Sequence, residues 1–132
     1  MFVHPRSPEV RVDALPSSRH VRVLLGGEVI ADSARPTILY ETGLSPRYYL
    51  PKTDVRMDLL TQTTSSSACP YKGWASYWTV EIGAARYEDI AWGYQTPLPE
   101  SEGIAGLVCF YNEKVDLEVD GEPAEQPKTK FS

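Results

Sequence analysis

A Gly-Gly pair at residues 26–27 is the feature of this chain that most constrains its fold. It separates the apolar segment 21–25 from a second segment, 28–32. Glycine adopts a positive φ without a steric penalty, which is what the two-residue turn of a β-hairpin requires. Eleven prolines and nine glycines among 132 residues also indicate many turns, short strands and few long helices. The chain is therefore predicted to be a mostly β protein.

Other short segments are predicted strands. Residues 38–41 and 47–50 form two of them, and Pro51 ends the second. A second hairpin is expected from residues 78–82 and 86–89, joined by a Gly-Ala turn. We expect these strands to form antiparallel sheets, with at most one or two short helices.

One short helix is expected in the middle of the chain. Thr53 or Asp54 can cap it, and it would run through Val55 and Met57 to Leu60. An extended segment is the alternative.

The two halves of the chain resemble each other. Asp32 aligns with Asp89 and Tyr40 with Tyr94, with offsets that vary with loop length. We interpret this as an internal duplication with pseudo-repeats at about 20–60 and 74–117; the alternative is a coincidence between two β-rich stretches. Residues 65–73 would then cross between the halves, and the seam between the two would be a natural place for a cleft.

The length of the chain predicts a single domain. Residues 1–19, rich in Pro, Ser and Arg, are expected to form an extended arm. Residues 20–119 would be the folded β domain and residues 120–132 a disordered tail.

Charge and motif content argue against several classes of function. The net charge is −5 and Lys and Arg are scattered, whereas a nucleic-acid-binding protein normally carries a basic patch. No apolar stretch approaches the roughly 18 residues of a membrane span, and no secretory signal is visible. The two cysteines lie outside any Cys-x-x-Cys pair, which favours a reduced, cytoplasmic protein. Clustered His and Cys are lacking, so neither a metal nor a cofactor is expected.

The run of residues 68–78 combines a thiol, an amine and four large aromatic side chains. A thiol beside a cation ionises more readily than a free one, so Cys69 near Lys72 is a candidate nucleophile or redox thiol. The alternative is a small buried residue beside a turn. Cys109 lies in the apolar segment 107–110 and is predicted to belong to the core.

Glu41 and Lys72 are candidate catalytic or binding groups. Glu41 ends a predicted strand, and the matching position in the second half is the neutral Gln95. Glu41 could pair with Lys72 or Arg47 at the seam, act as a general acid or base, or form a purely structural ion pair. Lys72 could bind an anion or remain a surface lysine.

Aromatic residues complete the candidate site. Strand alternation sends Tyr48 and Tyr49 to opposite faces and places Trp92 and Tyr94 on one face. Such residues can form an amphipathic wall for a ring-bearing ligand, although ordinary packing between sheets is the alternative. The predicted ligand-binding residues are Glu41, Tyr49, Tyr71, Lys72, Trp92 and Tyr94, and the candidate catalytic residues are Cys69, Glu41 and Lys72.

Several of these residues lie in motifs whose order and spacing resemble a known family. The motifs are Tyr40-Glu41-Thr42-Gly43, Tyr48-Tyr49-Leu50-Pro51, Cys69-Pro70-Tyr71-Lys72-Gly73, Ala91-Trp92-Gly93-Tyr94 and Phe110-Tyr111. Over about residues 20–117 the chain resembles the domain of unknown function 427 (DUF427) family. The resemblance implies a β-tent, in which antiparallel sheets meet at an angle. Relatives of that fold often bind zinc through two pairs of cysteines, which this chain lacks. An older family name suggests nucleotidyl transfer, but no motif here supports that activity.

Three classes of function remain open. We expect a module that binds a small polar or aromatic ligand at the seam between the halves. The alternatives are a small enzyme, acting through Cys69 or through Glu41 and Lys72, and a homodimeric interaction module. The protein is accordingly expected to be a monomer or a homodimer, with no nucleic-acid or membrane partner.

Overall fold

The Gly26-Gly27 pair forms the tight turn of a β-hairpin, as predicted. Both residues have positive φ, +56° and +84°, and they join two antiparallel strands, β3 (Val21–Leu25) and β4 (Glu28–Ser33). The structure is a computed structural model, and it describes residues 2–3, 11–69 and 72–124.

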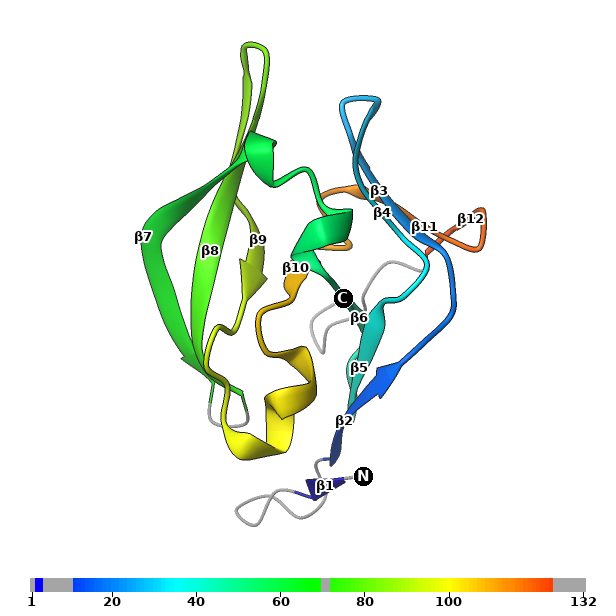
Figure 1. Cartoon of the computed structure of the whole chain (residues 1–132), viewed down its shortest axis with the longest axis vertical. Coiled ribbons are helices and arrows are strands. Elements are labelled where there is room, and N and C mark those ends of the chain that lie inside the picture. The colour runs from blue at the N-terminus through cyan, green and yellow to red at the C-terminus, as the bar shows by residue number, and fades with distance from the viewer. Residues whose placement is uncertain (1, 4–10, 70–71, 125–132) are drawn as a thin grey trace.

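The strands form two sheets, and every pairing between the named strands is antiparallel (Figure 1). An eight-stranded sheet has the order β1-β2-β5-β6-β10-β9-β8-β7, and a four-stranded sheet has the order β12-β11-β3-β4. The prediction of a mostly β protein with antiparallel sheets is confirmed. The remaining strands are β1 (Phe2–Val3), β2 (Arg11–Pro16), β5 (Thr37–Glu41), β6 (Arg47–Leu50), β7 (Leu60–Cys69), β8 (Gly73–Ile82), β9 (Ala85–Gly93), β10 (Val108–Phe110), β11 (Asp116–Val119) and β12 (Glu122–Pro123).

Helical structure in the described part of the chain is limited to three short 3-10 helices, one more than expected. They are η1 (Lys52–Asp54), η2 (Met57–Leu59) and η3 (Pro99–Ile104). The single helix expected to run to Leu60 is wrong, because Val55 is extended and forms a β-bridge with Ala31. The Arg56 N–H also donates to the Ile30 carbonyl at 2.8 Å. Burial of Val55 and bonding to β4 thus override the local helix signals.

The crossover expected at residues 65–73 is instead part of a long hairpin. Strands β7 and β8 have ten residues each and pair from Leu60 opposite Val80 to Cys69 opposite Gly73. The serines and threonines of β7 gave no strand signal because this edge strand is largely exposed and has no apolar alternation.

The β-structure extends beyond both ends of the expected folded unit, residues 20–119. Strand β2 lies within the expected arm and pairs with β5, with Val12 buried against the sheet. Strand β12 lies within the expected tail and pairs with β11. Residues 125–132 lie outside the described part of the chain.

The predicted internal duplication is not confirmed. The first hairpin, β3–β4, belongs to the four-stranded sheet, whereas the second, β8–β9, belongs to the eight-stranded sheet. Tyr40 is exposed within β5, whereas Tyr94 is buried just beyond the end of β9.

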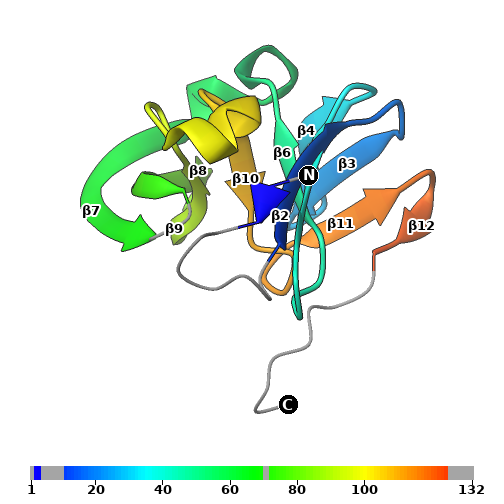
Figure 2. The ribbon, with the colours of Figure 1, turned by 90° about the horizontal axis from the view of Figure 1, so that it is seen from below.

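Two clusters of buried residues lie on opposite faces of the eight-stranded sheet. The first cluster fills the space between the eight-stranded and the four-stranded sheet. Figure 2 shows these two sheets side by side. The second lies on the other face and includes residues of β5, β6, β9 and β10. Neighbours in one strand alternate between the clusters: Leu50, Ala91 and Phe110 belong to the first, and Tyr49, Trp92 and Cys109 belong to the second.

Candidate functional site

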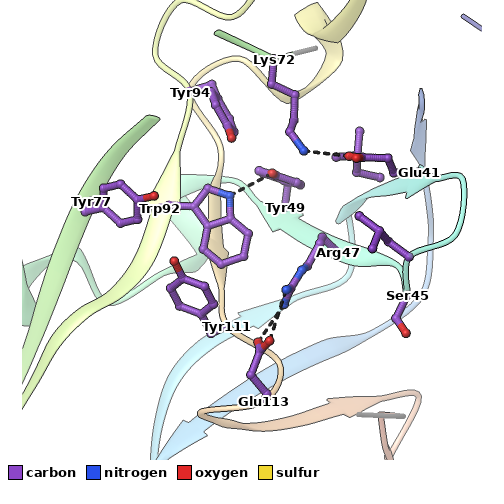
Figure 3. A pocket seen from close by; sticks show the side chains of 12 residues that line it. Glu41, Ser45, Arg47, Tyr49, Lys72, Tyr77, Trp92, Tyr94, Tyr111 and Glu113 are labelled. Carbon is purple, nitrogen blue, oxygen red and sulfur yellow. Dashed lines mark hydrogen bonds and ion pairs between the residues drawn. The ribbon is translucent and has the colours of Figure 1, made fainter. Parts of the chain in front are cut away.

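A cavity of about 260 Å³ opens on the face of the eight-stranded sheet that carries the second cluster. Strands β5 and β6 and the loop between them form one side, and β8, β9 and the segment after β10 form the other (Figure 3). Its lining residues are Leu39, Glu41, Leu44, Ser45, Arg47, Tyr49, Lys72, Tyr77, Trp92, Tyr94, Tyr111 and Glu113.

The structure brings most of the predicted site residues to this one cavity. Glu41, Tyr49, Lys72, Trp92 and Tyr94 all line it. Another predicted residue, Tyr71, lies outside the described residues.

Lys72 and Glu41 form an ion pair at one end of the cavity. The Lys72 Nζ donates to Glu41 Oε1 at 2.9 Å, and the side chains are only 14% and 17% exposed. The backbone of Lys72 is fixed on both sides: its N–H donates to the Cys69 carbonyl, and its own carbonyl accepts from the Leu98 N–H. Of the two partners considered for Glu41, Lys72 is therefore the one it contacts.

A second ion pair joins Arg47 to Glu113. The two terminal nitrogens of Arg47 donate to the two carboxylate oxygens of Glu113 at 2.9 and 3.3 Å. Burial raises the pKa of Glu113, but the hydrogen bonds from Arg47, a backbone hydrogen bond and the nearby positive charges together outweigh burial and leave this pKa below its usual range. Glu113 is thus held ionised, and the cavity carries two cations and two carboxylates in all.

Trp92 is the central ring of the cavity wall. Its indole N–H donates to the Tyr49 hydroxyl at 3.1 Å, and the two rings meet edge to face at 6.3 Å. Tyr111 packs on Trp92 with a centroid distance of 4.4 Å, and the Arg47 guanidinium lies 5.2 Å from the Trp92 centroid. These contacts fix the position of an aromatic surface that borders charged groups (Figure 3).

Gly93 allows the chain to place Trp92 and Tyr94 here. A Cβ at residue 93 would lie 2.3 Å from the Leu107 carbonyl oxygen, so only glycine fits without a backbone shift. Beyond it, the Tyr94 carbonyl accepts from the Gly106 N–H at 3.0 Å.

The hydroxyls of Tyr49, Tyr94 and Tyr111 remain protonated at neutral pH. Burial raises the pKa of Tyr49 well above its ordinary value, and burial likewise raises the pKa of Tyr94. The pKa of Tyr111 rises to about 12, first through burial and then through its neighbour Tyr77. These hydroxyls can therefore donate hydrogen bonds to a ligand.

The two cysteines are free thiols in different surroundings. Cys69 ends β7, is half-buried and is not among the residues that line the cavity. The cation expected to activate it, Lys72, contacts Glu41. Cys109 is fully buried, as predicted for a core residue, and burial raises its pKa to about 12.

Three residues that line the cavity, Arg47, Tyr111 and Glu113, were not predicted as binding residues from the sequence. Arg47 was considered only as a partner of Glu41, although alternation along β6 places it on the same face as Tyr49. Alternation continued past the end of β10 places Tyr111 on the same face as Cys109, so it could have identified Tyr111 as a residue of this face. Glu113 lies in the following turn, where no alternation of side chains predicts the face on which it lies.

The described residues offer neither a metal-binding cluster nor a membrane-spanning helix. They contain no group of three or more His, Cys, Asp or Glu side chains that could hold a metal ion. None of the described helices has the length and apolar character needed to cross a membrane.

The chain belongs to the family described as Domain of unknown function (DUF427), whose model matches residues 13–121. This match confirms the resemblance found from the sequence motifs, and it spans the chain from β2 to just before β12. The chain has no match among curated proteins.

Proposed function

We propose that this DUF427 protein binds a small, ring-bearing polar ligand in the cavity between β5–β6 and β8–β9. One observation carries the proposal: two ion pairs and a fixed aromatic wall converge on a single cavity from distant parts of the sequence. A few convergent polar groups set in an aromatic lining are typical of small-molecule sites.

The two ion pairs are poorly explained by stability alone. Removing charges from water costs free energy, and replacement of such a pair by packed apolar residues is often neutral or stabilising. The same sheet shows this alternative on its other face, where the first cluster is built mainly from aliphatic residues. Charges kept at the cavity are therefore better explained by recognition of a ligand.

The size of the cavity limits the ligand. Pockets for drug-sized molecules start at roughly 300 Å³, and this cavity, at about 260 Å³, is slightly smaller. We therefore expect a ligand with one ring and a short polar substituent.

The test is a screen of small ring-bearing polar compounds by ligand-observed NMR and by thermal shift. In this proposal Trp92 contacts the ring and Lys72 contacts the polar substituent. Compounds that bind the wild-type protein should lose binding in Trp92→Leu and Lys72→Met. They should keep it in Trp74→Leu, because Trp74 is exposed and does not line the cavity. The proposal fails if every bound compound still binds both cavity variants, or if no compound binds at millimolar concentration.

A further inference from the structure

We infer that the ligand is a zwitterion, a ring-bearing molecule with both a carboxylate and an ammonium group, of which an aromatic α-amino acid is the simplest example. This inference rests on the proposed function and adds the charge of the ligand. It follows from the Lys72–Glu41 ion pair, which presents one cation and one carboxylate at the same end of the cavity.

Binding of a ligand with a single charge would leave either Lys72 or Glu41 without a partner of opposite charge. If a ligand carboxylate took the place of Glu41 beside Lys72, the Glu41 carboxylate would lose its partner while remaining largely buried. A partly buried charge without a partner is strongly unfavourable. A ligand ammonium alone would do the same to Lys72. A zwitterion supplies a new partner to each side chain, so neither charge is left uncompensated.

The pair also has the hydrogen-bonding capacity for this exchange. An ammonium has three N–H donors, and among the described residues the Lys72–Glu41 contact uses one of them. The contact engages Oε1 of Glu41, and a carboxylate has two oxygens that accept. Lys72 and Glu41 can therefore bind a carboxylate and an ammonium as their own contact lengthens.

The second ion pair does not compete for this role. Arg47 is bound to both oxygens of Glu113, and its guanidinium lies against Trp92 and Tyr111. The ligand ring would then lie against Trp92, beside the Tyr94 hydroxyl, with its charged end toward Lys72 and Glu41 (Figure 3).

The experiment compares ligands that share one ring and differ in charge. The probes are L-phenylalanine, N-acetyl-L-phenylalanine as the anion, L-phenylalaninamide as the cation and benzyl alcohol as the neutral ring, with the corresponding series for L-tyrosine and L-tryptophan. Isothermal titration calorimetry on the full chain gives the dissociation constants. At least one amino acid should bind about tenfold or more tightly than its two singly charged derivatives, the scale of losing one partner of a desolvated charge pair.

Variants of the protein test the same assignment from the other side. Glu41→Gln should weaken binding of the amino acid about tenfold or more, because only the amino acid has an ammonium for Glu41, and it should not weaken binding of the N-acetyl form, which no longer leaves a carboxylate without a partner. Asp58→Asn is the matched control, since it breaks the exposed Arg56–Asp58 pair outside the cavity and should change neither constant. If Glu41→Gln does not fold, the comparison of ligand charges on the wild-type protein still decides.

Two results would overturn the inference. If a singly charged or neutral probe binds as tightly as its amino acid and requires Trp92, the ligand is not a zwitterion but the proposed function stands. If none of the amino acids binds, the inference falls, and the wider screen of ring-bearing compounds then decides the proposed function by itself.

Discussion

The two faces of the eight-stranded sheet are made by neighbouring residues of the same strands but differ in chemistry. The first cluster is closed by the four-stranded sheet and consists mostly of Val, Leu and Ile. The second is smaller and rich in Tyr and Trp, and it opens into a cavity with two ion pairs. Because alternation along each strand separates the two sets, side chains on one face can change with little effect on the other.

In the function that we propose, stability and ligand recognition are divided between the two faces. Apolar area removed from water is the main source of stability, and the first cluster supplies most of it. The second cluster retains polar atoms that each need a specific partner, such as the Trp92 indole and the Tyr49 hydroxyl. Substitutions on each face can therefore show how separate the two faces are.

The largest effect is expected from Ile30→Ala in the first cluster. Ile30 is fully buried on β4 and does not line the cavity. Loss of its side chain leaves a cavity in a closed core and should lower the free energy of unfolding by about 2–5 kcal/mol. Urea denaturation measures the loss, and cavity ligands should bind the folded variant as they bind the wild type.

A changed ligand affinity in Ile30→Ala would show that the faces are coupled. If this variant is too unstable to purify, Ile30→Val makes the same comparison at an expected cost of about 0.5–1.5 kcal/mol.

Gly93→Ala is expected to have the next largest effect and to act on the cavity face. The new methyl group would collide with the Leu107 carbonyl oxygen, and relief requires a shift of the backbone between Trp92 and Tyr94. We expect a loss of about 1–3 kcal/mol in stability together with weaker binding of cavity ligands. Chemical denaturation and calorimetry measure the two quantities.

Gly103→Ala is the matched control for Gly93→Ala. Its Cβ would lie 3.2 Å from the Ala14 Cβ and 3.8 Å from the Ala14 carbonyl oxygen, and residue 103 does not line the cavity. Equal losses of ligand affinity in the two variants would contradict a specific role for Gly93.

Much of the fold could be predicted from the sequence because its signals are local. The Gly26-Gly27 turn, the end of β6 before Pro51 and the alternation of Tyr48 and Tyr49 each depend on a few adjacent residues. Strands β2 and β7 were missed for a physical reason. Each lies toward an edge of its sheet, and the sequence of β7 is mainly Ser and Thr, so neither has the apolar repeat of a central strand.

The candidate site was predictable only in part. Glu41, Lys72 and Trp92 were identified from residue type and motif context, and the structure places all three at one cavity. The partner of Arg47, Glu113, could not be identified, because pairing across 66 residues depends on how β6 and β10 align. Such long-range register is a property of the folded sheet and cannot be predicted from a few adjacent residues.

A smaller effect is expected from Tyr49→Phe, which removes one hydroxyl from the second cluster. The Trp92 indole N–H donates to this hydroxyl, and without it a buried donor loses its partner. Such a loss should cost about 1–3 kcal/mol, toward the lower end for a neutral donor. Tyr48→Phe is the matched control one residue away on the other face, where the half-buried side chain packs against the first cluster. A loss in Tyr48→Phe as large as in Tyr49→Phe would show that the two faces do not differ in this way.

The smallest effect is expected at high pH and concerns Tyr111. In the unfolded chain a tyrosine ionises near pH 10, whereas burial and Tyr77 raise the pKa of Tyr111 in the folded chain to about 12. Between these values the unfolded state releases a proton that the folded state keeps, so the free energy of unfolding falls as the pH rises. Tyr111→Phe keeps the ring that packs on Trp92 and removes the titrating hydroxyl. Because Tyr111 is only half-buried, solvent screening reduces the effect. Urea denaturation from about pH 9 to pH 12 should give a shallower decline for Tyr111→Phe than for the wild type, and an equal slope would show that the hydroxyl of Tyr111 is not kept protonated by the fold.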